Sequence, residues 1–163
     1  MAVKALAQRT YVEDRRTLIH VDANISLFGE VPYALNEFTL LKRDVNSMIK
    51  IHTYLNGEFL NTYWADGLIV APDSQSFVIT PVAPHNLNVR PIVVPDDNVI
   101  SFEIESRGDQ VICSLDARRE IVHKDVQLAI RKEQFTVNLL RLSENNFLQT
   151  LHNKLTWGLD KRN

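Results

Sequence analysis

Apolar and polar residues alternate along much of this chain, and this period of two limits the fold more than any other feature. Residues 49–55 read Ile-Lys-Ile-His-Thr-Tyr-Leu, which is the pattern of a strand with one buried face. Asn56-Gly57 follows directly, and Phe59–Trp64 then resumes a strand-like run. Asn-Gly readily adopts the left-handed backbone of a tight turn. The sequence therefore predicts a β-hairpin centred on residues 56 and 57.

The same criterion predicts strands along most of the remaining chain. Clusters of turn-forming residues separate them at 95–98, at 107–109 (Arg-Gly-Asp, which we interpret as a turn) and at 123–125. Many short strands with closely spaced turns indicate an all-β fold, either a β-sandwich or an irregular barrel. With no internal repeat or linker, we treat residues 1–163 as one domain. The further strands are Phe77–Thr80, Val99–Glu105, Val111–Leu115, Val126–Lys132 and Phe135–Leu142.

Short helices are predicted only at the two ends of the chain. Ala2–Gln8 has the composition of a helix. Near the other end, apolar residues recur at a spacing of four between a capping residue and a terminating glycine. We expect this apolar stripe to pack on the sheet, with docking to a partner helix as the alternative. The residues concerned are Ser143, Phe147, Leu151, Leu155 and Gly158.

Composition excludes several classes of protein. Net charge is −2, and the Lys and Arg residues are scattered, whereas nucleic-acid binders usually carry a basic stripe. The longest apolar runs, such as Leu68–Ala71 and Ile92–Val94, are far too short to cross a bilayer. A single cysteine excludes an internal disulfide framework. We therefore expect a reduced, cytoplasmic protein that binds neither nucleic acid nor membrane.

The chain also lacks the common devices for phosphate and metal binding. Its five glycines are all far apart in the sequence, whereas phosphate-binding loops need closely spaced glycines for the backbone to approach the anion. Its five histidines fall on separate predicted elements, so no metal site is predicted. Cys113 lies in an apolar strand, and we interpret it as a core residue and not as a nucleophile.

Two polar groups interrupt otherwise apolar sequence. Asn36-Glu37 falls within the apolar stretch Ala34–Leu41, which predicts a strand. The pair is either a feature of a sheet edge or a site, because deep burial would require partners for both side chains. Asp66 lies in Ala65-Asp66-Gly67, between aromatic and aliphatic residues. An isolated Asp-Gly is commonly a turn, so neither group alone assigns a function.

Taken together, these segments resemble the NAD kinase family, and the chain is similar to its C-terminal, NAD-binding domain. The likeness covers nearly the whole chain in the family's order, with details similar to the bacterial members. The segments that carry it are 33–37 (Tyr-Ala-Leu-Asn-Glu), 56–58 (Asn-Gly-Glu), 63–70 (Tyr-Trp-Ala-Asp-Gly-Leu-Ile-Val), 79–87 (Ile-Thr-Pro-Val-Ala-Pro-His-Asn-Leu), 89–91 (Val-Arg-Pro), 94–97 (Val-Pro-Asp-Asp), 114–116 (Ser-Leu-Asp) and the tail 153–163.

The resemblance implies an enzyme that transfers the γ-phosphoryl group of ATP, with a divalent metal, to the ribose 2′-hydroxyl of NAD, giving NADP. Two departures from the family pattern stand out. The Gly-Gly-Asp-Gly motif, whose aspartate serves as general base, is absent from residues 1–163. The stretch Thr-Gly-Ser-Thr-Ala-Tyr and the following Gly-Gly-Pro are also absent, because Ala71 runs directly into Pro72. We therefore expect an internal truncation near Ala71-Pro72 and an isolated chain without catalytic activity.

By the same resemblance, Asn36 and Glu37 face the adenosine part of NAD or NADP. Asp66 reaches the dinucleotide of a neighbouring subunit, because the family forms dimers and tetramers with shared sites. Ala83 and His85 line the same pocket. Amide and carboxylate groups suit this role because ribose hydroxyls and exocyclic amines need fixed acceptors. From its loop alone, His85 is equally well interpreted as a turn histidine with satisfied hydrogen bonds.

Two other interpretations remain open at this stage. The chain could be an oligomerisation module that no longer binds nucleotide, as the absent glycine-rich stretch suggests. It could also derive from a lipid kinase, because diacylglycerol and sphingosine kinases share the wider fold. The Asn36-Glu37 and Ala65-Asp66-Gly67 segments favour NAD over a lipid.

Overall fold

The structure is a computed structural model that describes residues 2–45, 47–73, 75–142, 151 and 154–155. The chain divides into two units, one made of residues 1–15 and 138–163 and the other of residues 16–137. The first unit contains α1 (Ala2–Ala7), which confirms the predicted N-terminal helix to within one residue. The predicted C-terminal helix lies largely outside the described residues and stays a prediction.

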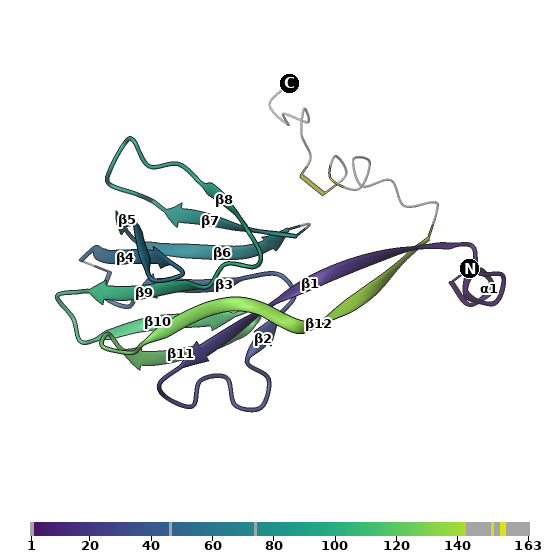
Figure 1. Ribbon diagram of the computed structural model, residues 1–163, viewed down its shortest axis with the longest axis horizontal. Coiled ribbons are helices and arrows are strands. Elements are labelled where there is room, and N and C mark those ends of the chain that lie inside the picture. Colours follow the sequence, from purple (N-terminus) through teal and green to yellow (C-terminus); the bar gives the residue numbers. More distant parts are fainter. Residues whose placement is uncertain (1, 46, 74, 143–150, 152–153, 156–163) are drawn as a thin grey trace, which may run out of the picture. The chain divides into compact units, whose positions relative to one another are not determined.

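Among the described residues, the strands form two six-stranded sheets (Figure 1). The first has the order β2-β1-β12-β9-β4-β5, and the second has the order β11-β10-β3-β6-β7-β8. The first sheet comprises β1 (Tyr11–Ala23), β2 (Tyr33–Ala34), β4 (Ile49–Leu55), β5 (Glu58–Ala65), β9 (Ile100–Glu105) and β12 (Leu128–Leu142). The second comprises β3 (Phe38–Lys42), β6 (Gly67–Asp73), β7 (Ser76–Val82), β8 (Ile92–Pro95), β10 (Gln110–Leu115) and β11 (Arg118–His123).

The inner faces of the two sheets share one hydrophobic core. Ile51 on β4 and Leu40 on β3 are both fully buried members of it. The rings of Phe38 on β3 and Phe102 on β9 stack with centroids 6.2 Å apart, so they join the sheets directly. This arrangement confirms the predicted all-β, sandwich-like fold.

The hairpin predicted at residues 56 and 57 is also confirmed. Asn56 and Gly57 join β4 to β5 and have φ values of +51° and +83°, the left-handed pair that a two-residue hairpin turn needs. The Asn56 side chain accepts a hydrogen bond from the Val99 N–H at 2.9 Å, which ties the turn to the start of β9.

Several strands of the structure differ from those predicted by the hydrophobic pattern. The sequence prediction omitted β1, β6, β8 and β11, and it divided β12 into two segments. In β11, the residues 118–120 are Arg-Arg-Glu, so this edge strand shows no apolar alternation. The start of β1 is similarly charged. Charged residues are common on sheet edges, where they oppose aggregation, and they hide the strand from a hydrophobic pattern.

Candidate functional site

The polar pair Asn36-Glu37 lies outside regular strand. The single strand predicted for Ala34–Leu41 is wrong, because β2 ends at Ala34 in one sheet and β3 begins at Phe38 in the other. Residues 35–37 are the connection between the two sheets. Both polar side chains are exposed, so the burial cost considered from sequence does not arise.

Asp116, in the turn between β10 and β11, holds this connection in place. Its carboxylate accepts hydrogen bonds from the backbone N–H groups of Leu35 (3.0 Å), Asn36 (2.8 Å) and Glu37 (3.1 Å). The Asp116 N–H in turn donates to the Glu37 carbonyl at 3.0 Å. Burial alone would raise the pKa of Asp116, but the three backbone N–H groups and the Asn36 side chain together outweigh it, and the pKa lies below its ordinary value.

Asp66 lies between β5 and β6 and is fixed by β3 and β7. Its carboxylate forms an ion pair of 2.6 Å with Lys42 Nζ, and its carbonyl accepts a hydrogen bond from the Lys42 N–H at 2.9 Å. Its own N–H donates to the Val82 carbonyl. Gly67 follows it at a close approach of two strands: a Cβ added there would lie 2.3 Å from the Leu40 carbonyl oxygen. The carboxylate is partly exposed.

Ala83 and His85 follow β7 near Asp66. Ala83 is exposed and has a φ of +45°, an uncommon conformation for a residue with a side chain. The His85 N–H donates to the Trp64 carbonyl at 2.9 Å, and the two rings meet edge to face with centroids 4.4 Å apart. The His85 backbone is thus satisfied as the turn interpretation expected, while its ring stays exposed.

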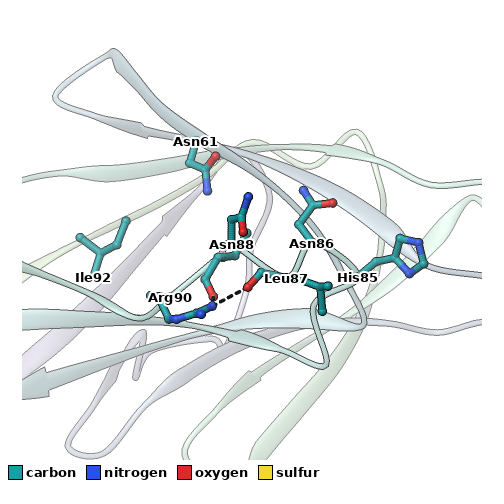
Figure 2. A pocket seen from close by; sticks show the side chains of 8 residues that line it. Asn61, His85, Asn86, Leu87, Asn88, Arg90 and Ile92 are labelled. Carbon is teal, nitrogen blue, oxygen red and sulfur yellow. Dashed lines mark hydrogen bonds between the residues drawn. The ribbon is translucent and has the colours of Figure 1, made fainter.

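The loop that begins at His85 borders an open cleft of about 730 Å³ (Figure 2). In this view the amides of Asn61, Asn86 and Asn88 lie around the cleft, whereas the His85 ring lies at its margin. The Arg90 guanidinium is turned back to the Leu87 carbonyl, to which it donates at 2.6 Å. The lining residues are Asn61, His85, Asn86, Leu87, Asn88, Val89, Arg90 and Ile92.

The five predicted site residues therefore fall into two groups within one chain. Asn36 and Glu37 directly precede Phe38, the first residue of β3. Asp66 forms its ion pair with Lys42, the last residue of β3. Ala83 and His85 belong to the Asp66 group. A strand rises about 3.3 Å per residue, so the five steps from residue 37 to residue 42 separate the groups by roughly 17 Å.

The expected truncation lies near the first of these groups. β6 and β7 pair without interruption from Gly67 with Val82 to Asp73 with Ser76. Because Phe38 pairs with Val70, the turn that follows Asp73 lies toward the Asn36-Glu37 end of β3. Ala71 and Pro72, where the truncation is expected, lie within β6, and only two residues connect β6 to β7.

Other candidate chemistry is limited. Cys113 is fully buried, as predicted, and burial together with the Glu120 charge raises the pKa of its thiol to about 12. In the described part of the chain, no group of three or more His, Cys, Asp or Glu side chains is arranged to hold a metal ion. The same residues contain no helix long and apolar enough to cross a membrane.

Comparison with solved structures identifies the fold first. The chain superposes on yeast NADH kinase, solved with NADH, with a TM-score of 0.81 at 15% identity, covering 97% of this chain and 54% of the yeast chain. An NAD kinase from Archaeoglobus fulgidus, solved with ATP, gives a TM-score of 0.71 at 21% identity, covering 95% and 64%. The two-sheet fold is therefore one that occurs in kinases of NAD and NADH.

Sequence comparison then identifies the family. Residues 65–142 match the family profile described as the ATP-NAD kinase C-terminal domain. The chain is 46% identical to the NAD kinase of Cytophaga hutchinsonii over 99% of its length, and 36% identical to that of Bacteroides fragilis over 98%. The chain belongs to the NAD kinase family and carries its C-terminal domain. It spans 62% and 61% of these two relatives.

Sequence reasoning missed two residues of the candidate site. In the sequence, Asp116 stands out only as part of the resembling segment 114–116, and no motif marks Lys42. Each acts on a residue distant in sequence, Asp116 on Asn36 at a separation of 80 residues. No local pattern links such pairs. The available signal is the residue type of Asp116. Aspartate tolerates the left-handed backbone better than most residues, and Asp116 has a φ of +51° in the turn between β10 and β11.

Proposed function

We propose that this chain is the dinucleotide-binding part of an NAD kinase and that it binds NAD or NADP. In the full-length family enzyme, the dinucleotide would accept a phosphoryl group from ATP with the help of a divalent metal. Membership of the family supports this proposal. The presence of Asn36, Glu37, Asp66, Ala83 and His85 on exposed or partly exposed connections, and not in the core, also supports it.

We also propose that one binding site combines residues of two subunits. The observation that carries this is the roughly 17 Å separation of the two groups along β3, worked from the rise of a strand. One subunit would supply Asn36 and Glu37, and another would supply Asp66, Ala83 and His85. Because each subunit has both groups, a symmetric homodimer or tetramer would contain complete sites.

Calorimetric titration of the 163-residue chain with NAD and with NADP tests the binding proposal. We expect both Glu37→Gln and Asp66→Asn to weaken binding, whereas Asp97→Asn, an exposed substitution in the turn between β8 and β9, should have no effect. If the wild-type chain binds neither dinucleotide, the proposal is wrong.

Mixing the two variants tests whether the site is shared. In a mixed dimer of Glu37→Gln and Asp66→Asn subunits, one site carries both substitutions and the other carries neither. We therefore expect unfolding and refolding of the mixture to recover tight sites that neither variant has alone. A mixture that binds no better than its components would show that each site lies within one subunit.

These 163 residues contain no Gly-Gly-Asp-Gly motif, so we propose that they do not catalyse phosphoryl transfer by themselves. Phosphoryl transfer depends on positioning and charge stabilisation around the phosphates, and the sequence has no clustered glycines to provide them. A coupled assay for NADP formation with ATP and Mg²⁺ should give no turnover. Turnover by the isolated chain would overturn this statement.

A second candidate is a β domain that builds an oligomer without binding nucleotide. The two-residue connection between β6 and β7 favours it. The alignment with the Cytophaga protein also favours it, because it spans 180 positions against a chain of 163 residues. That relative therefore has residues without a counterpart here. Sedimentation showing a stable dimer or tetramer, together with no heat of binding for NAD or NADP, would favour this candidate over the first.

A further inference from the structure

Three charged side chains at alternate positions contact the segment that leads to Asn36 and Glu37. Glu120 on β11 accepts a hydrogen bond from the Phe28 N–H at 2.7 Å. Arg118 donates to the carbonyls of Val31 and Tyr33, the second at 2.6 Å. Further along, the Asp116 carboxylate accepts hydrogen bonds from the backbone N–H groups of residues 35–37. We call Asp116, Arg118 and Glu120 the charged ladder.

The charged ladder takes the place of a neighbouring strand. β11 is the edge of its sheet, and segment 28–37 lies along it in the opposite direction, from Phe28 at Glu120 to residues 35–37 at Asp116. The two carboxylates accept from N–H groups and the guanidinium donates to carbonyls, so each charge meets the backbone group of opposite polarity. Hydrogen bonds to charged groups are shorter and stronger than neutral ones.

Asp116 makes the contacts closest to the candidate site. Its carboxylate oxygens approach three consecutive N–H groups within 3.1 Å. Its own N–H donates to the Glu37 carbonyl, so the contact is reciprocal. Its backbone has the left-handed φ of +51°, which Asp and Asn tolerate better than most residues. These contacts fix the backbone of the pair. The Asn36 side chain also donates a hydrogen bond to the Asp116 carboxylate, and both side chains of the pair stay exposed.

We propose that Asp116 is a positioning residue for dinucleotide binding, which fixes the Asn36-Glu37 backbone so that both side chains face the ligand. This inference rests on the proposed function, because it takes Asn36 and Glu37 as ligand contacts. A purely structural role is the alternative, in which the loss of Asp116 lowers stability but leaves the affinity of the folded protein unchanged. The two roles predict different results for the same variant.

Asp116→Asn is the informative substitution. Asparagine tolerates the same backbone conformation, and its carbonyl oxygen can still accept from the N–H groups of residues 36 and 37. Its amide nitrogen cannot accept from the Leu35 N–H, and the negative charge is lost. Asp116→Ala removes all three contacts. If Asp116 positions the pair, affinity should decrease in the order wild type, Asn variant, Ala variant.

Two measurements separate positioning from stability. Amide hydrogen exchange, followed by NMR without ligand, should show residues 35–37 exchanging about tenfold faster in Asp116→Asn, the ratio expected for the loss of one charged hydrogen bond. Calorimetry at a temperature where every variant is folded should show NAD affinity reduced by a similar factor, about tenfold. Asp125→Asn, an exposed charge in the turn that follows β11, serves as the charge-matched control and should change neither.

Ile51→Val serves as the stability-matched control, because Ile51 is fully buried on β4 in the other sheet. It should lower the melting temperature and leave NAD affinity unchanged. If Asp116→Asn binds NAD as tightly as Asp125→Asn, the positioning role is refuted. If the wild type binds no NAD, the proposed function fails, and unchanged exchange at residues 35–37 would then refute the inference separately.

Discussion

Gly67→Ala should destabilise the protein strongly, because β3 and β6 approach too closely for a side chain at this position. The new Cβ would lie 2.3 Å from the Leu40 carbonyl oxygen, 2.5 Å from Leu41 Cδ2 and 3.0 Å from Leu41 Cα. Two of these atoms are backbone and cannot rotate away, so the strands must separate. Overpacking costs about 1–3 kcal/mol, and a backbone clash places this substitution near 3 kcal/mol.

Urea and thermal unfolding measure this effect. For a protein of this size, a loss of about 3 kcal/mol lowers the melting temperature by roughly 6–12 °C. Gly108→Ala is the matched control, because the nearest atom to its added Cβ is Ser106 Oγ at 4.0 Å. It should be neutral or stabilise by up to about 1 kcal/mol. If Gly67→Ala lies within about 0.5 kcal/mol of wild type, near the range of ordinary surface substitutions, the close-approach argument is wrong.

Two further predictions concern titratable groups. Cys113 is buried and the pKa of its thiol is about 12, so thiol reagents should leave the folded protein unmodified and label it fully in denaturant; labelling at the same rate in both conditions would contradict this. The pKa of Asp116 is lower than its ordinary value of 3.8, so its carboxylate stabilises the fold above that value, and this contribution is lost as pH falls through the lower folded-state value. In Asp116→Asn, the urea midpoint should therefore fall less steeply than in the wild type below about pH 5. If the midpoint of the variant falls as steeply as that of the wild type, the Asp116 carboxylate does not make the stabilising contacts described.

The hairpin of β4 and β5 could be predicted because its determinants are local. Alternation over residues 49–55 reports which face is buried, and Asn56-Gly57 reports the turn. Ile51 and Thr53 are fully buried on the inner face, as the alternation requires. Where a strand has one apolar face and a short turn, the sequence is sufficient.

The Asn36-Glu37 connection could not be predicted in the same way. Its apolar neighbours on both sides favour one continuous strand, yet Ala34 and Phe38 belong to different sheets. The chain can leave the first sheet because Asp116, 80 residues away from Asn36 in sequence, accepts the N–H groups released from strand pairing. Backbone groups that leave a ladder need other partners, and distant partners leave no local signal.

The error in β11 and the error in the Asn36-Glu37 segment have the same physical cause. Charges at 118 and 120 conceal β11 as a strand, and the same charges contact the backbone of the crossing segment. A hydrophobic pattern does not predict either segment, because charged side chains of β11 take the hydrogen bonds that a paired strand would otherwise make. Such side-chain partners are needed where the backbone leaves both sheets. Charges at alternate positions that follow a turn aspartate therefore predict an edge that holds an irregular segment. In this chain, that segment contains Asn36 and Glu37.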